Sequence, residues 1–203
     1  MNTQSLIQEL IKIKAFQIGR FQLKSGLISP FYLDLRLIIS YPKLLKTIAS
    51  LLLKKMEDYS FDLLCGVPYA ALPIATAMSL EQELPMIIKR KKLKNYGTKK
   101  EIEGHFEQGM NCIVIEDLIT SGDSLIDTIT SLRSHGLNIH RVAFILDREQ
   151  GGINKLIANK VEPYSLLTLS QLLTEALSLG YLNKKQLENI QNFIHSSQTI
   201  QTL

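Results

Sequence analysis

The sequence predicts an α/β protein with a mostly parallel sheet flanked by helices. Short apolar runs, such as Phe61–Cys65 and Cys112–Ile115, alternate with segments of helical periodicity, and this alternation is typical of parallel sheets. With 203 residues and 45% hydrophobic composition, the chain can bury the core of one such domain. No internal repeat or low-complexity tract divides it, so a single domain is expected.

The N-terminal part is expected to contain a helix and a small flap. Apolar residues recur at helical spacing from Ser5 to Phe16, which predicts a short helix. The segment Phe21–Arg36 (FQLKSGLISPFYLDLR) has the pattern of two extended pieces joined by a turn around Gly26, with Pro30 ending the turn. Another helix is expected after Pro42, because proline suits the first turn of a helix.

The elements of the sheet follow in chain order. They are the strand Phe61–Cys65, a turn (GVPYAALP) and a helix reaching Met78, the strand Pro85–Ile88, the strand Cys112–Ile115, the helix Leu125–Leu132 and the strand Val142–Leu146. Ser170–Ile194 is expected to be helical, with a second helix that follows Gly180 and starts at Asn183–Lys185. The interval Arg90–Asn111 shows neither helical nor strand periodicity, and such a long interval in a compact domain is usually a functional loop or a disordered insert.

The chain is therefore divided into an N-terminal helix and hood (1–40), a core sheet (61–170) with a flexible lid at about 90–111, and C-terminal helices (170–203). No apolar run approaches the roughly eighteen residues of a membrane span. The N-terminus lacks the pattern of a signal peptide, so a cytoplasmic protein without a membrane partner is expected. Cys65 and Cys112 lie in expected strands and are interpreted as reduced, buried residues.

The positive charge of the chain is local. Lys89–Lys100 (KRKKLKNYGTKK) contains seven basic residues and no acidic one. Without these seven, the 23 basic residues become 16 against 19 acidic ones, and the net charge changes from +4 to −3. A local cluster of this kind indicates a site for one concentrated anion and argues against a nucleic-acid partner.

The segment Glu116–Ser124 (EDLITSGDS) combines two acids with a chain of small hydroxyl and glycine residues. Because it follows an expected parallel strand and precedes a helix, it should lie where such sheets bind ligands. Backbone N–H groups at a helix N-terminus bind phosphate, which indicates a phosphomonoester at Thr120–Ser124. Glu116 and Asp117 would repel that group, so they should face sugar hydroxyls or a divalent cation. A ribose 5-phosphate has both features.

Two other interpretations of this segment stay open. Ser121 or Ser124 could simply cap the helix, with the two acids solvated in a loop. The segment could also belong to a receiver-like or other Mg²⁺-dependent phosphoryl-transfer site, although the GxxxxGK[ST] pattern of triphosphate-binding loops is missing.

The basic segment would supply the cations for a second anionic group. Arg90, Lys91, Lys92 and Lys94 can neutralise a pyrophosphate, and Gly97 gives the segment a place to bend. A lid of this kind would exclude water from a reactive sugar cation. The alternative is a solvated charge run or a nuclear-targeting patch.

Several motifs together resemble those of orotate phosphoribosyltransferases, a branch of the type I phosphoribosyltransferases. They are EDLITSGDS, FQLKSGLISPFYLDLR, CGVPYAALPIA, KRKKLKNYGTKKEIEG and LDREQGG, in the order and at about the spacing found in that family. The resemblance extends from about Phe16 to Gly152 and is greatest to the orotate domain of uridine monophosphate synthases. It implies the type I phosphoribosyltransferase fold with an N-terminal hood. It also implies conversion of orotate and phosphoribosyl diphosphate to orotidine 5′-phosphate and diphosphate, in pyrimidine biosynthesis.

The resemblance also implies a set of substrate-binding residues. They are Lys24, Tyr32, Leu33, Tyr69, Ala70, Arg90, Lys91, Lys94, Tyr96, Glu116, Asp117, Leu118, Ile119, Thr120, Ser121, Gly122, Asp123, Ser124 and Arg148. Lys91, Glu116 and Asp117 are the residues expected to act in catalysis. Mg²⁺ is expected as cofactor, held mainly by substrate oxygens, so no side chain is assigned as a certain ligand.

Within this set, each motif implies contact with one part of the substrates. The Tyr69–Ala70 turn would contact the pyrophosphate. Lys24 would contact substrate from the flap, and the backbone of Tyr32 and Leu33 would meet the orotate ring. Arg148 would bind the orotate carboxylate, which suits a bidentate guanidinium; otherwise it would be a surface residue between Asp147 and Glu149.

The family further implies a homodimer in which Lys91 reaches the neighbouring subunit's site. Because the chain ends at Leu203, without room for a decarboxylase domain, only a loose association with a separate orotidine phosphate decarboxylase is expected. Asn95 and Ala70 depart from the family pattern: many members carry an acid and a lysine there, so Ala70 removes one pyrophosphate contact. Two other functions remain as alternatives, a transferase for purine bases and a regulator that uses the same fold as a sensor.

Overall fold

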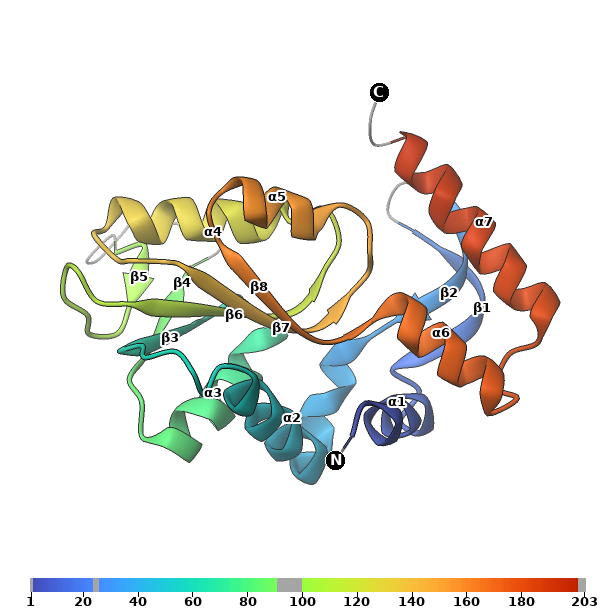
Figure 1. Cartoon of the computed structure of the whole chain (residues 1–203), viewed down its shortest axis with the longest axis horizontal. Helices are drawn as coiled ribbons and strands as arrows, with labels where there is room; N and C mark the ends of the chain where they lie inside the picture. The colour runs from blue at the N-terminus through green and yellow to red at the C-terminus, as the bar shows by residue number, and fades with distance from the viewer. Residues whose placement is uncertain (1, 24–25, 91–99, 201–203) are drawn as a thin grey trace.

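The computed structural model describes residues 2–23, 26–90 and 100–200, except the side chains of residues 197–200. Its centre is a six-stranded sheet with helices on both faces, and a separate two-stranded hairpin lies beside it (Figure 1). The predicted α/β class with a mostly parallel sheet is confirmed. Within the described ranges, no helix combines the length and apolar character needed to cross a bilayer.

The strands are β1 (Phe16–Gln22), β2 (Ile28–Leu33), β3 (Leu63–Gly66), β4 (Met86–Lys89), β5 (Ile102–Glu103), β6 (Cys112–Ile119), β7 (Arg141–Asp147) and β8 (Glu162–Thr168). The helices are α1 (Thr3–Lys12), the 3₁₀ helix η1 (Leu35–Ser40), α2 (Pro42–Lys55), α3 (Ala71–Gln82), α4 (Asp123–Ser134), α5 (Gly152–Ala158), α6 (Leu169–Ser178) and α7 (Lys184–Ile200). The large sheet has the order β5-β4-β3-β6-β7-β8, and β5 alone runs antiparallel to its neighbour.

The sheet reverses its winding between β3 and β6. From β3 the chain crosses through α3 to β4 on one side, and from β6 it crosses through α4 to β7 on the other. The ladder between β3 and β6 ends at Gly66 and Ile115, so the last residues of β6 pair only with β7. The two strands therefore separate at their carboxyl ends, and this is the position at which open α/β sheets bind ligands.

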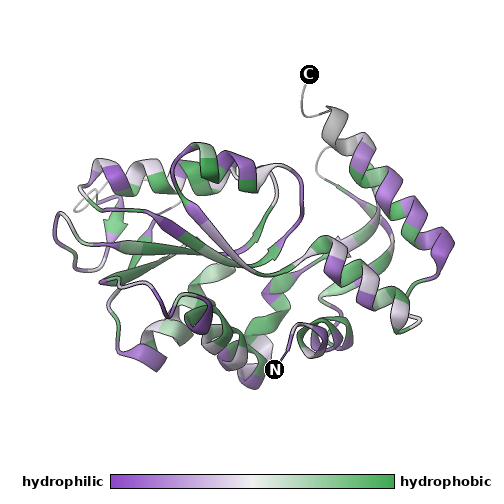
Figure 2. Ribbon diagram, viewed as in Figure 1, coloured by the Kyte–Doolittle hydropathy of each residue, from purple (hydrophilic) through white to green (hydrophobic). Residues whose placement is uncertain are grey.

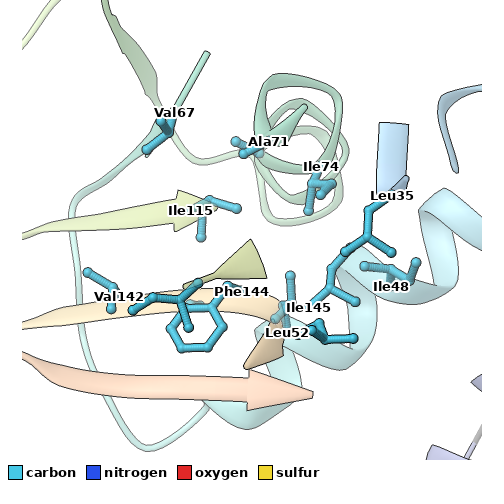
Figure 3. Close-up of a cluster of buried hydrophobic side chains, with 14 of the residues drawn as sticks. Leu35, Ile48, Leu52, Val67, Ala71, Ile74, Ile115, Val142, Phe144 and Ile145 are labelled. Atoms are coloured by element: carbon cyan, nitrogen blue, oxygen red, sulfur yellow. The ribbon is translucent and has the colours of Figure 1, made fainter. Parts of the chain in front are cut away.

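The core lies on both faces of the large sheet. The first four residues of β6 are all buried, which explains their continuous apolar run, because helices cover both faces of the strand. Figure 2 shows the strands mostly in the hydrophobic colour, whereas the helices alternate between hydrophobic and hydrophilic residues. In Figure 3, Ile145 of β7 lies beside Leu52 of α2, in a layer that also contains Ile74 of α3.

The hairpin β1–β2, the hood, is held by the C-terminal helices. Phe31 of β2 is buried, with its ring centroid 6.2 Å from that of Phe16 and 6.4 Å from that of Phe193 in α7. The hydroxyl of Tyr181 donates a hydrogen bond of 3.0 Å to the carbonyl oxygen of Phe16. The predicted hairpin, with Gly26 in its turn at a φ of +85°, is thus confirmed, and α7 and Tyr181, which precedes that helix, contribute to its support.

The boundaries of the hood differ from the prediction in two respects. Phe16 begins β1 instead of ending the first helix, because its ring packs in the core of the hood. Pro30 lies inside β2 and does not end the turn. It faces the register shift between Ile18 and Phe21, where the ladder is interrupted, so its missing N–H costs no regular strand pairing.

Further differences concern the sheet and the lid interval. Strand β6 continues through Glu116–Ile119, so the two acids lie within the strand and not beyond its end. The interval Arg90–Asn111 was expected to be a loop, but it contains β5, which pairs with β4. The sequence also gave no expectation of β8 or α5.

Candidate active site

A cavity of about 400 Å³ lies at the carboxyl ends of β3 and β6, where these strands separate. Most of its lining was predicted from the sequence, namely Tyr69, Ala70 and every residue from Glu116 to Ser124. Three further residues line it that were not predicted: Arg36, Pro68 and Leu125. The structure thus brings together the turn after β3 and the segment after β6.

The segment Thr120–Gly122 leads from β6 into α4. Gly122 precedes the helix with a φ of +81°, and a Cβ there would lie 3.3 Å from backbone atoms of Gly152. Both the positive φ and the close neighbour favour glycine at this position. No side chain caps α4, so the interpretation of Ser121 or Ser124 as a helix cap is wrong. The uncapped first turn borders the cavity, as a phosphate-binding helix terminus does.

The loop after β7 packs directly beneath this segment. The N–H of Arg148 donates to the carbonyl oxygen of Ile119, and the N–H of Gly152 donates to that of Thr120, both at 3.0 Å. A Cβ at Gly152 would lie 2.5 Å from Cγ1 of Ile119 and 2.6 Å from the Thr120 oxygen. Gly152 therefore supports the segment Thr120–Gly122, the predicted phosphate-binding segment, and the LDREQGG motif did not predict this role.

The two acids of the segment lie on adjacent positions of β6 and are both partly buried. The N–H of Asp117 donates to Oε1 of Glu116 at 3.0 Å. Leu118 and Ile119, also predicted to bind substrate, line the same cavity. The side chain of Ile119 belongs to the core at 1% exposure, so this residue can offer a ligand only its backbone.

Asp123 makes contacts that the sequence did not predict. Its carboxylate accepts hydrogen bonds from Nζ of Lys155, on α5, and from Oγ of Ser121 at 2.6 Å. These two contacts, with that of Lys155 the larger, lower the pKa of the Asp123 carboxyl. Lys155 therefore neutralises an acid at the edge of the proposed phosphate site. No sequence pattern had indicated this pairing, because it joins two separate helices.

Arg148 lies outside this cavity lining, between the large sheet and the hood. Its guanidinium carbon is 5.6 Å from the ring centroid of Phe31. Its Nε is buried without a hydrogen-bond partner, and no ion pair with an acid is formed in the described part of the chain. Burial lowers the pKa of the Arg148 guanidinium. Arg148 is partly buried as a residue, and a buried N–H donor such as its Nε is costly when unpaired, so an anionic ligand would satisfy it.

The hood contributes the predicted residues Tyr32 and Leu33, neither of which lines the 400 Å³ cavity. Tyr32 stacks on Phe21, with 5.3 Å between ring centroids. Its hydroxyl accepts a hydrogen bond of 3.1 Å from Nη2 of Arg36. Unlike Tyr32 and Leu33, Arg36 does line the cavity. Its position there was not predicted, because a single arginine after a strand has no distinctive sequence pattern.

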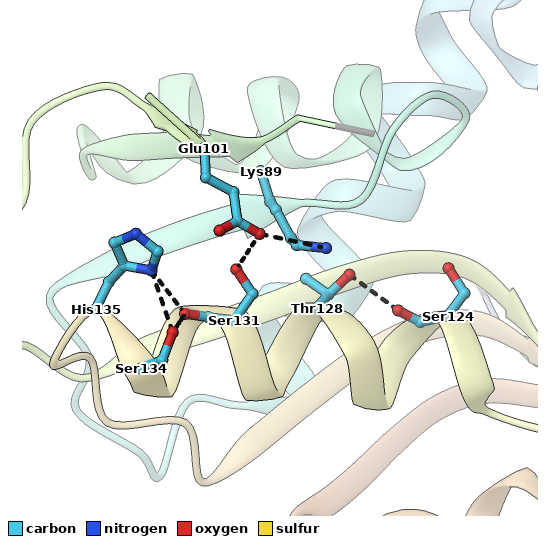
Figure 4. A network of polar contacts seen from close by, with 7 residues as sticks. All are labelled: Lys89, Glu101, Ser124, Thr128, Ser131, Ser134 and His135. Atoms are coloured by element: carbon cyan, nitrogen blue, oxygen red, sulfur yellow. Dashed lines mark hydrogen bonds and ion pairs between the residues drawn. The ribbon is translucent and has the colours of Figure 1, made fainter. Parts of the chain in front are cut away.

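The start and the end of the basic segment are fixed to the sheet and to α4. The backbone N–H of Arg90 donates to the backbone carbonyl oxygen of Glu101 at 2.9 Å, and the Arg90 guanidinium forms an ion pair with the Glu103 carboxylate. Glu101 accepts a hydrogen bond of 2.6 Å from Ser131 of α4 and lies 3.9 Å from Nζ of Lys89 (Figure 4). Lys24, Lys91, Lys94 and Tyr96 fall outside the described residues.

The donor set of the cavity fits a hard cation. Glu116 and Asp117 offer carboxylate oxygens, and Mg²⁺ commonly binds to one or two carboxylates together with substrate phosphates. Among the described residues, no three His, Cys, Asp or Glu side chains are grouped to hold a metal by themselves.

Residues 38–162 match the family model of the phosphoribosyl transferase domain. The chain is 41% identical over 180 residues to the orotate phosphoribosyltransferase of Chlamydia caviae, a match that covers 88% of this chain and 87% of that protein. It is 42% identical over 195 residues to the uridine 5′-monophosphate synthase of Bos taurus, covering 95% of this chain and 41% of the relative.

Two solved structures extend the comparison to the fold. The UMP synthase of Leishmania donovani matches with a TM-score of 0.85 and 31% identity, over 96% of this chain and 42% of that one. The orotate phosphoribosyltransferase of Aeropyrum pernix matches with a TM-score of 0.76 and 28% identity, over 88% and 99%. The chain thus spans about two fifths of the synthases and most of the length of the separate transferases.

Proposed function

The chain belongs to the orotate phosphoribosyltransferases of the phosphoribosyl transferase domain family, and on that premise we propose that it forms orotidine 5′-phosphate and diphosphate from orotate and phosphoribosyl diphosphate. This reaction belongs to the de novo synthesis of pyrimidines. The observation that carries the choice of base is Arg148, a partly buried cation beside the hood whose Nε is buried without a hydrogen-bond partner. Orotate is an acidic pyrimidine, and its carboxylate is the kind of group that a guanidinium binds with two hydrogen bonds.

In the proposed reaction, N1 of orotate displaces diphosphate from C1 of the ribose, with inversion and through an oxocarbenium-like transition state. Thr120–Ser124 hold the 5-phosphate at the uncapped start of α4, and Glu116 and Asp117 bind the ribose hydroxyls near the developing cation. The protein contributes mainly position and electrostatic stabilisation. Lys24, Arg90, Lys91, Lys94 and Tyr96 keep the substrate-binding roles that the family resemblance implies.

We propose Mg²⁺ as the cofactor, because Glu116 and Asp117 offer the carboxylate oxygens that this ion prefers as ligands. The ion would neutralise charge on the departing diphosphate. The two carboxylates contribute separately, because they fix the ribose whether or not they contact the metal.

A homodimer with shared sites is part of the proposal. Large side chains lie exposed at the cavity: Tyr69, which lines it, is 72% exposed, and Ile39, which shares a smaller pocket with Tyr69, is 60% exposed. Such a patch next to a site suits a second copy of the chain. Mixed dimers of Lys91→Ala and Asp117→Asn subunits should regain activity at one of their two sites. Mixed dimers no more active than either parent would contradict site sharing.

The synthases among the relatives suggest a further partner. Because orotidine 5′-phosphate is the product proposed here, a separate decarboxylase that consumes it could associate loosely with this chain.

The test of the proposed function supplies one base at a time. The protein is mixed with phosphoribosyl diphosphate, Mg²⁺ and orotate, uracil, adenine or hypoxanthine, and loss of base and release of diphosphate are measured. Orotate should be consumed, whereas uracil, which lacks only the carboxylate, should react far more slowly. Consumption of a purine base without orotate would contradict the proposal, and consumption of no base would favour the regulator.

A substitution of Arg148 tests whether this residue binds the orotate carboxylate. Arg148→Leu should lower kcat/KM for orotate by about a hundredfold, since a hydrogen bond between charged groups is lost. The matched control is Arg20→Leu, at an exposed arginine of β1, which should leave kcat/KM unchanged. Equal losses in both variants would point to a general effect of charge.

A further inference from the structure

The residues that line the main cavity are poor in positive charge. They include the carboxylates of Glu116, Asp117 and Asp123, and their single cation is Arg36 in the described part of the chain. Lys155 neutralises Asp123 from outside the lining. A sugar substrate with a phosphate at one end and a diphosphate at the other needs cationic partners at both ends. Arg36 is therefore the side chain to consider for the second end.

Arg36 is grouped with the turn that follows β3. It lies in η1, directly after the hood strand β2. With Tyr69 and Ala70 it lines both the main cavity and an adjacent pocket of about 190 Å³. The Pro68–Ala70 turn itself carries no charged side chain. Arg36 thus brings a positive charge to the wall of the cavity formed by the turn after β3.

A carboxylate fixes the orientation of the Arg36 guanidinium. Nε lies 2.6 Å from Oδ1 of Asp34, and Nη2 lies 2.9 Å from Oδ2 and 3.1 Å from the hydroxyl of Tyr32. The hydrogen bond from Arg36 is the largest contribution that lowers the pKa of the Asp34 carboxyl, so the acid stays ionised. The two N–H groups on Nη1 take no part in these contacts.

The ion pair between Arg36 and Asp34 preorganises the guanidinium for binding an anion. The side chain of Arg36 is 65% exposed, whereas that of Asp34 is 18% exposed, so the pair presents its cationic member outward. An exposed ion pair contributes little to the stability of a fold. A planar guanidinium whose Nε and Nη2 are engaged in this way can still donate to a phosphate group through the two N–H groups of Nη1.

We propose that Arg36 binds the diphosphate group of the sugar substrate and that Asp34 positions it for this contact. The inference rests on the proposed function, which provides a substrate with a diphosphate at the reacting carbon. It adds a binding residue on the wall of the cavity formed by the turn after β3, where the described lining offers no other cation. The contact is lost when diphosphate leaves the site.

The test separates the two ends of the substrate by direct binding. Titration calorimetry at constant Mg²⁺ measures the affinity of wild type and Arg36→Gln for three probes: phosphoribosyl diphosphate, inorganic pyrophosphate and ribose 5-phosphate. The variant should bind the first two about ten- to hundredfold more weakly, the loss expected for a charged hydrogen bond. Ribose 5-phosphate, which lacks the diphosphate, should bind unchanged.

Two further variants distinguish charge from position. Arg36→Lys should recover part of the pyrophosphate affinity, and Asp34→Asn should lose part of it although the arginine remains. Arg20→Gln, which removes an exposed arginine elsewhere in the hood, should bind all three probes like the wild type. Thermal unfolding of each variant checks that the fold is intact.

The outcomes also separate this inference from the proposed function. Unchanged pyrophosphate binding in Arg36→Gln, or an equal loss for ribose 5-phosphate, would overturn the inference while the proposed function stands. If wild-type protein bound neither phosphoribosyl diphosphate nor pyrophosphate, both would be refuted.

Discussion

Replacing Gly152 by alanine tests whether the loop after β7 holds the phosphate-binding segment in place. A methyl group there would lie 2.5 Å from Cγ1 of Ile119 and 2.6 Å from the backbone oxygen of Thr120. The first neighbour is a core side chain at 1% exposure and the second is backbone, so neither can move aside easily. The substitution would also strain the hydrogen bond of 3.0 Å from the Gly152 N–H to Thr120.

The expected cost follows from these two effects. Overpacking a close contact costs about 1–3 kcal/mol, and a weakened hydrogen bond costs about 0.5–1.5 kcal/mol. We expect Gly152→Ala to lower the free energy of unfolding by about 2–4 kcal/mol, a large share of the roughly 5–15 kcal/mol typical of a folded protein. Displacement of Thr120 should also weaken binding of phosphoribosyl diphosphate.

Urea unfolding and calorimetric titration with phosphoribosyl diphosphate measure these two quantities. The control is the neighbouring variant Gly151→Ala. Gly151 has a φ of +91°, but nothing lies within 4 Å of a Cβ there, so alanine introduces only backbone strain of about 1–2 kcal/mol. This control should retain substrate affinity. If Gly152→Ala unfolded at the same urea concentration as wild type and bound substrate equally well, the argument from contact would be refuted.

Two other substitutions probe the charges around the site. Lys155→Met should weaken binding of phosphoribosyl diphosphate about two- to fivefold, because it leaves the Asp123 carboxylate without its cation. Adding Asp123→Ser should restore the affinity measured by calorimetric titration. A double variant that binds no better than Lys155→Met would contradict this explanation. Burial raises the pKa of the Asp147 carboxyl above its ordinary value of 3.8, so the folded state holds that proton more tightly than the unfolded chain does. This carboxyl therefore lowers stability as the pH rises from 3.8 through its raised pKa. Asp147→Asn keeps the acceptor for the Glu149 N–H, so its stability in urea should improve relative to wild type as the pH rises through that window; a difference independent of pH would contradict the assignment.

The fold was predictable where hydrophobic periodicity was strong. The start of β6 is buried on both faces, which leaves a continuous apolar run. The helix after Pro42 is buried along one stripe, which leaves apolar residues at helical spacing. Strand β8 was missed because Pro163 interrupts it and most of its residues are only partly buried, as suits an edge strand. The end of β6 was missed because its acids face a cavity instead of the core.

The candidate site was predictable as far as contiguous sequence defines it. Glu116–Ser124 forms one wall of the cavity as a single segment, so its motif could be read directly. Arg36, Gly152 and Lys155 contribute through contacts between elements far apart along the chain, and such contacts leave no local pattern. Lys24 and the lid residues 91–99 lie outside the described residues, so their roles stay predictions.

The support of the hood by the C-terminal helices has a consequence for the order of folding. The hairpin of β1 and β2 is complete by Leu33, yet the hydrogen bond from Tyr181 to Phe16 spans 165 positions. Contacts of such long sequence separation close late, because the entropy of the intervening chain must be lost first. The large sheet can therefore assemble before the hood is secured. During synthesis, the hood side of the cavity would become rigid only after α7 has left the ribosome.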